Sequence, residues 1–130
     1  MTDITFADIA RKTIEIVNER PNFNYQEFRK KQLNKPADYR WHEIACVYFD
    51  GDNEPSCLFG HVFAALEIGY NRSWENTGIT DLIQDTLNIE CTMPQRNWLN
   101  SLQSSQDQGY SWGAALDNAN ELYPEVTEAL

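Results

Sequence analysis

Apolar residues recur every three or four positions in the first twenty residues of the chain, which is the spacing of one face of an α-helix. The run begins after Thr5, which forms a T-x-x-D capping pattern with Asp8, and it stops at Pro21. The positions of this face are Phe6, Ile9, Ala10, Thr13, Ile16 and Val17. The pattern predicts an amphipathic helix over residues 6–20.

The middle of the chain gives the clearest strand signal. Residues 43–49 read EIACVYF, which is rich in β-branched and aromatic residues, and the turn-forming sequence DGDNEP follows at 50–55. Before this run, residues 24–40 are polar and basic with unevenly spaced aromatics. We expect a strand over 43–49, a turn after it, and an irregular arm or short edge strand over 24–40.

Helical periodicity returns in the second half of the chain. The segment after Ser56 has the widest apolar stripe, which predicts the central, most buried helix, with Ser56 as its cap and Gly69 as its stop. Thr92 and Ser111 are caps of the two later helices, and Pro124 ends the last one, leaving a frayed acidic tail over 123–130. The expected helices cover residues 57–67, 79–87, 93–108 and 111–123.

These elements predict the fold class. About five helices with one or two short antiparallel strands make a compact, helix-dominated α+β fold. The 130 residues fit a single globular domain over 1–130. No run approaches the roughly 18 apolar residues that cross a bilayer, no secretory signal pattern is visible, and the three cysteines form an odd set. We therefore expect a cytoplasmic protein with no membrane contact.

The charge is unevenly distributed. The net charge is −10, and eight of the ten basic residues lie in the first 40 positions. Because DNA binding depends on basic residues that displace counterions, so acidic a chain disfavours direct nucleic-acid binding. The same field favours a protein partner with a basic surface, or imitation of DNA towards a DNA-binding protein.

Metal and catalytic chemistry are the next candidates. Cys46, Cys57, His61 and Cys91 are the residue types of a zinc site, but no C-x-x-C pair is present. The acidic loop from Asp50 lacks the glycine and the bidentate glutamate of a calcium loop. No phosphate-binding or nucleophile motif occurs, and we expect buried thiols, no catalytic residues, no metal and no cofactor.

Two surface segments are candidates for partner binding. The first is the acidic turn with Asp50, Asp52 and Glu54, and the second is the polar and aromatic edge with Gln106, Asp107 and Tyr110. A structural alternative for the second edge is that Asp107 accepts from the backbone of the turn at 109–111, while Trp112 anchors the last helix in the core.

Several short segments resemble a group of small acidic proteins of phages that infect actinobacteria. They are CVYFDG at 46–51, EPSCLFG at 54–60, LEIG at 66–69 and LQSSQDQGYSWGAA at 102–115. The basic stretch 26–40 departs from the group, and His61 is not a position that it holds fixed. The resemblance implies a cytoplasmic protein of the infected or lysogenic bacterium, and it implies no activity.

The sequence thus favours a non-enzymatic phage accessory protein that binds a host or phage macromolecule, most simply a protein with a basic surface. An acidic DNA mimic that inhibits a DNA-binding protein is the first alternative. A small zinc-binding or thiol-dependent enzyme, built on Cys57 and His61, is the second.

Overall fold

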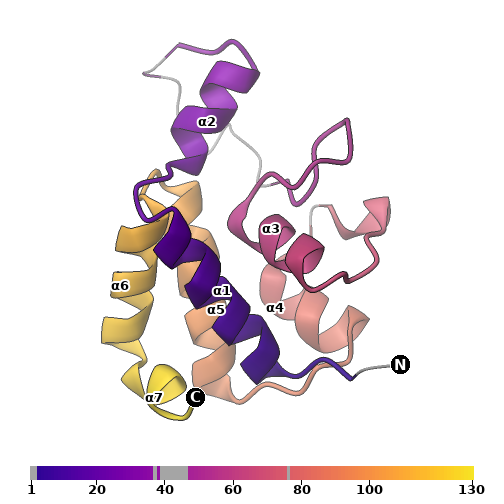
Figure 1. Cartoon of the computed structure of the whole chain (residues 1–130), viewed down its shortest axis with the longest axis vertical. Coiled ribbons are helices and arrows are strands. Elements are labelled where there is room, and N and C mark those ends of the chain that lie inside the picture. Colours follow the sequence, from indigo (N-terminus) through magenta and orange to yellow (C-terminus); the bar gives the residue numbers. More distant parts are fainter. Residues whose placement is uncertain (1–2, 37, 39–46, 76) are drawn as a thin grey trace.

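Helices make up most of the computed structural model, which describes residues 3–36, 38, 47–75 and 77–130 (Figure 1). Two short segments, η2 (Arg72–Trp74) and η3 (Leu82–Thr86), are a 3₁₀ turn and a π-helical turn. The α-helices are α1 (Phe6–Glu19), α2 (Tyr25–Gln32), α3 (Leu58–Ala65), α4 (Ile79–Asp81), α5 (Met93–Asp107), α6 (Trp112–Leu122) and α7 (Pro124–Glu128). In the part of the chain that is described there is no strand and no sheet, only two isolated bridges. The α+β prediction is therefore wrong, and the fold is all-α in the described residues.

The predicted strand at 43–49 shows why the fold class was wrong. Its first four residues lie outside the described residues, and 47–49 contain a single bridge residue instead of a strand. Side chains take the place of a neighbouring strand here. The hydroxyl of Tyr25 accepts from the amide of Val47 at 3.0 Å, and the carboxylate of Glu75 accepts from the next two amides at 3.1 and 3.3 Å. The amides of the described part of the run, residues 47–49, are therefore bonded without a sheet.

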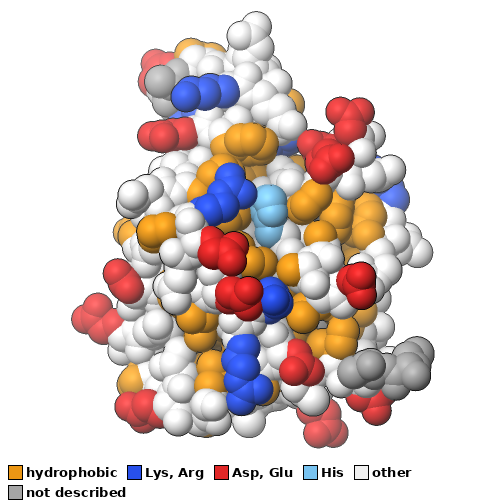
Figure 2. All heavy atoms as spheres, viewed as in Figure 1, with side chains coloured by type: hydrophobic (Ala, Val, Ile, Leu, Met, Phe, Trp, Pro, Cys, Tyr) orange, Lys and Arg blue, Asp and Glu red, His pale blue; other side chains and the backbone are white. Residues whose placement is uncertain are grey.

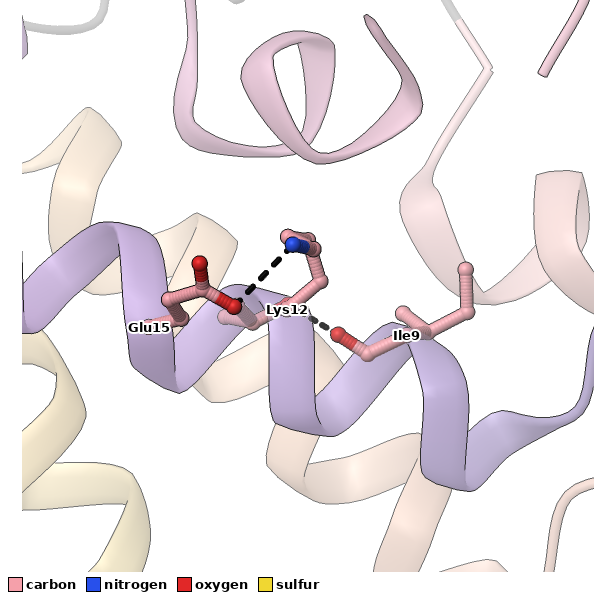
Figure 3. Close-up of polar contacts among 4 residues, drawn as sticks. Ile9, Lys12 and Glu15 are labelled. Atoms are coloured by element: carbon pink, nitrogen blue, oxygen red, sulfur yellow. Dashed lines mark hydrogen bonds and ion pairs between the residues drawn. The ribbon is translucent and has the colours of Figure 1, made fainter. Parts of the chain in front are cut away.

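The first helix is as predicted. Thr5 and Asp8 form a complete capping box, and the buried face consists of the six predicted positions. The hydroxyl of Thr13 donates to the carbonyl of Ile9 at 2.7 Å, and Lys12 pairs with Glu15 at 3.0 Å on the outer face (Figure 3). Thr13 on the buried face, and Lys12 with Glu15 on the outer face, are thus bonded within the helix.

The basic segment 24–40 is not irregular throughout, because residues 25–32 form α2. Asn24 caps this helix by accepting from the amide of Glu27 at 3.0 Å, a signal that the composition of the segment obscured. Asn24 also donates to the carbonyl of Gly109 at 2.7 Å. Helix α2 stands at the upper end of the molecule in Figure 1, and it contacts α5.

Helix α5, not α3, is the centre of the bundle. It contacts α2, α3, α4, α6 and α7, whereas α1 packs across α3 and α6. The core between them contains two fully buried tryptophans, Trp98 and Trp112. The helix predicted at 57–67 as the central, most buried one is α3, and its leucine, valine and phenylalanine side chains have no exposed area, but α5 contacts more of the other helices.

Two glutamines of α5 supply the caps that α3 and α4 lack. Neither Cys57 nor Gly78, the residues before these helices, makes a side-chain cap, and Ser56 is buried without a bond from its hydroxyl. Instead, Gln106 accepts from the amide of Leu58 at 2.7 Å, and Gln103 accepts from the amide of Ile79 at 3.0 Å. The predicted Ser56 cap is thus replaced by a long-range one.

Close backbone approach fixes the position of α3. A Cβ on Gly60 would lie 1.9 Å from the carbonyl oxygen of Tyr48. The helix ends in a Schellman motif in which Glu67 adopts φ 57° and the amide of Ile68 bonds to Phe63 at 2.9 Å. The left-handed residue is therefore a glutamate, and the predicted stop at Gly69 comes two residues too late.

The acidic tail is not frayed. Residues 124–128 form α7, whose Val126 is only 3% exposed and belongs to the core. Arg11 of α1 donates to the terminal carbonyl of Leu130 at 3.1 Å. The end of the chain is thus packed against α5 and α6.

Candidate functional site

The acidic turn, defined as residues 50–54, is a tightly bonded loop. One carboxylate oxygen of Asp50 accepts from the amides of Asp52 and Glu54 at 2.9 and 3.1 Å. Asn53 adopts φ 61°, and its amide donates to the carbonyl of Asp50 at 3.0 Å. A bridge between Phe49 and Pro55 closes the base of the loop. The loop is therefore preformed.

Asp50 is the organising side chain of the turn. Desolvation raises the pKa of its carboxyl, but the amides of Glu54 and Asp52, with Gln32 and the charge of Arg29, outweigh that effect and hold the pKa below 3.8. Asp50 is thus ionised at neutral pH and engaged within the chain. Its carboxylate accepts from Gln32 and from two backbone amides, and its contact with a partner stays a prediction.

Arg72 clamps the outside of the turn. Its guanidinium donates to the carbonyls of Phe49 and Asp50 at 3.2 and 3.0 Å and to the side-chain oxygen of Asn53 at 2.7 Å. It bonds no carboxylate there. Asp52 and Glu54 are exposed, and neither forms an ion pair with a described residue. The turn consequently presents two carboxylates on a rigid base.

Glu75 holds the segment that leads into the turn. In addition to the two backbone amides already described, its carboxylate accepts from the hydroxyl of Tyr70. Burial first, and then the bond and charge of Glu75, raise the pKa of Tyr70 to about 12. The sequence interpretation missed this pair and Arg72. One signal was available for Arg72, because only two basic residues occur after position 40.

The second predicted edge divides between core and surface. Gln106 has no exposed area and bonds inside the protein, so it is not accessible to a partner. Its amide nitrogen donates to Asp107 at 3.2 Å, whereas Tyr110 is 49% exposed. Trp112 is fully buried, as the structural alternative expected. Tyr110 is the one residue of this edge with a large exposed surface.

The two predicted patches do not join into one surface. Gln32, at the C-terminal end of α2, donates to Asp50 at 3.2 Å, whereas Asn24, before its N-terminal end, bonds to Gly109 beside Tyr110. The eight residues of α2 lie between them, a length of about 12 Å at 1.5 Å per residue. A partner that covers both patches must also cross the basic side chains of α2.

Acidic side chains are scattered over the face that Figure 2 shows, and they form no rows on it. Within the described residues, Lys12 and Glu15 form the one ion pair. A DNA mimic needs carboxylates spaced like phosphates along a duplex, so the distribution on this face argues against that alternative.

The described metal candidates, Cys57, His61 and Cys91, do not form a group. Cys57 is fully buried among apolar side chains, Cys91 is half-buried beside Arg96, and Cys46 lies outside the described residues. In the part of the chain that is described, no three metal-ligating side chains form a group. Burial raises the pKa of the Cys91 thiol more than Arg96 lowers it, which favours the unreactive thiol form.

His61 belongs to an aromatic cluster. Its ring lies edge-on to Trp112 at 5.4 Å, and the guanidinium of Arg20 covers Phe23 and Trp112 at 4.3 and 5.4 Å. Burial, followed by the charge of Arg20, lowers the pKa of His61 to about 4. The imidazole is therefore neutral at pH 7 and serves as a packing group.

No family model, curated protein or solved structure matches the chain. None of the described helices combines the length and the apolar character needed to cross a membrane.

Proposed function

We propose that the protein acts without catalysis, by binding a protein with a basic surface through the acidic turn. The observation that carries this proposal is the geometry of the turn. The loop is held by hydrogen bonds with the polar groups of Asp50, Arg72 and Glu75. The carboxylates that remain exposed on it are those of Asp52 and Glu54.

A rigid loop suits this role for a physical reason. Binding costs less free energy when the contacting loop is already ordered, because less conformational entropy is lost. The net charge of −10 adds long-range attraction towards a basic partner and speeds the encounter. We place this binding in the cytoplasm of an infected bacterium, on the resemblance to actinobacteriophage proteins.

The test compares three forms of the protein as bait in a nuclease-treated actinobacterial lysate. Asp52→Lys combined with Glu54→Lys reverses both exposed charges of the turn. Asp117→Lys combined with Glu121→Lys makes the same change in net charge on the exposed face of α6.

We expect one or two proteins to be retained by the parent and by the α6 variant, and retention by the turn variant to fall at least tenfold. Opposing like charges in an interface costs several kcal/mol, which corresponds to more than tenfold in affinity. Equal loss in both variants would show that only net charge matters, and it would refute the turn as the binding site. A folded parent that retains nothing would refute the proposed function.

A further inference from the structure

A pocket of about 500 Å³ lies against α2, and residues 50–54 do not line it. The described residues that line it include Lys30, Lys31 and Lys35 and a single acidic residue, Glu27, so these four side chains carry a formal charge of 3 − 1 = +2. This volume lies within the range of about 300–1,000 Å³ that small-molecule sites occupy. A cationic pocket stands out on a chain whose net charge is −10.

Lysines in the last turn of a helix also complement its dipole, so their charge alone does not indicate a ligand. The second observation concerns Gln26, which lines the same pocket. Its side chain is 98% buried, and neither its amide nitrogen nor its amide oxygen has a hydrogen-bond partner. Buried amides are almost always bonded, and an orphaned one points to a group that the protein alone does not supply.

The chemistry of the lining selects a class of ligand. A carboxamide presents a donor and an acceptor side by side, which matches the donor and acceptor edge of a nucleobase such as adenine. Lysine ammonium groups bind phosphate as point charges. A carboxylate such as Glu27 accepts from ribose hydroxyls in nucleotide sites. A nucleoside phosphate carries all three of these groups: a base edge, a phosphate and ribose hydroxyls.

We propose that this pocket binds a nucleoside phosphate, with Gln26 on the base edge, the lysines on the phosphate and Glu27 on the ribose. The site shares no lining residue with the acidic turn. It adds a small-molecule ligand to a protein that the preceding section treats as a protein-binding module.

Isothermal titration calorimetry with adenosine 5′-monophosphate, ribose 5-phosphate and inorganic phosphate tests this proposal. We expect the parent to bind the nucleotide more tightly than ribose 5-phosphate, and both more tightly than phosphate. Gln26→Leu removes the orphaned amide and keeps an apolar side chain of similar size, so it preserves the fold, which a thermal melt verifies. It should weaken nucleotide binding about tenfold or more and leave ribose 5-phosphate unchanged.

Charge is tested separately. Lys31→Gln should weaken all three ligands, whereas Lys12→Gln, the same substitution on α1, should weaken none. Failure of the parent to bind the nucleotide would overturn the proposal. So would a folded Gln26→Leu protein that binds the nucleotide as the parent does, because the lysines alone would then account for the binding.

Discussion

Replacing Gln106 with leucine removes one acceptor that serves two buried donors. The side-chain oxygen of Gln106 accepts from the amide of Leu58 at 2.7 Å and from the indole nitrogen of Trp112 at 3.0 Å. Leucine has a similar volume and no polar atoms. The substitution therefore leaves both donors buried without a partner and opens no large cavity.

The expected cost follows from those two donors. A buried donor that loses its acceptor costs about 1–3 kcal/mol, so the pair costs about 2–6 kcal/mol. A small domain has a total free energy of unfolding of about 5–15 kcal/mol. We expect Gln106→Leu to remove a large share of the stability and to lower the urea midpoint strongly.

Urea unfolding followed by tryptophan fluorescence measures this effect. Gln108→Leu is the matched control, because the same substitution on an exposed glutamine two residues away should change the free energy of unfolding by less than about 0.5 kcal/mol. A double-mutant cycle with Trp112→Phe isolates one donor. In that background Gln106→Leu should cost about 1–3 kcal/mol less than in the parent, because only the Leu58 amide is left unpaired.

Two results would refute the reasoning. One is a cost below about 1 kcal/mol for Gln106→Leu in the parent. The other is an equal cost in the parent and in the Trp112→Phe background, which would show that the glutamine acts through packing and not through its shared acceptor.

Three further predictions rest on packing and titration. Gly60→Ala should destabilise the protein by about 3 kcal/mol or more in chemical denaturation, because its Cβ would meet the Tyr48 carbonyl at 1.9 Å, whereas Gly69→Ala, with open space around it, should cost far less. Since the pKa of His61 is about 4 in the fold and 6.5 when unfolded, the unfolded chain takes up the proton first, and stability present above pH 6.5 is lost as the pH falls towards 4. The pKa shift corresponds to about 3 kcal/mol for a fully buried group, and we halve it to about 1.5 kcal/mol because His61 is partly exposed. The free energy of unfolding of His61→Phe, relative to that of the parent, should therefore rise by about 1.5 kcal/mol between pH 7 and pH 4, which melts at both pH values measure. Val126→Ala should cost about 1–3 kcal/mol in urea unfolding, and a cost below 0.5 kcal/mol would mean that the tail does not contribute to the core.

Local signals in the sequence predicted the helices well where the cap lies next to the helix. The predicted Thr5–Asp8 box forms, and Thr92 and Ser111 cap α5 and α6 as expected. In each case the capping side chain is within three residues of the amide that it binds. Such pairs can be predicted from the sequence because the two residues are neighbours in the chain.

The sequence interpretation failed where the partner is distant. Tyr25 and Glu75 replace a neighbouring strand for residues 47–49, and no spacing rule connects positions so far apart. Gln106 looked like a surface residue because glutamine is usually exposed. It is buried because two donors from other helices converge on it. The acidic turn could be predicted as a turn, but its rigidity could not, since Arg72 comes from a later segment.

The two capping glutamines of α5 also have a consequence for the order in which the protein folds. Leu58 and Ile79 are synthesised 48 and 24 residues before the side chains that bind their amides. A nascent chain that has not yet released α5 from the ribosome has no caps for α3 and α4, and their first amides are bound only by water. Helix α3 packs mainly on α1, which is made before it, so this contact does not wait for α5. The first amides of α3 and α4 gain their side-chain acceptors only when α5 has been made, and the two helices are completed by the later part of the chain.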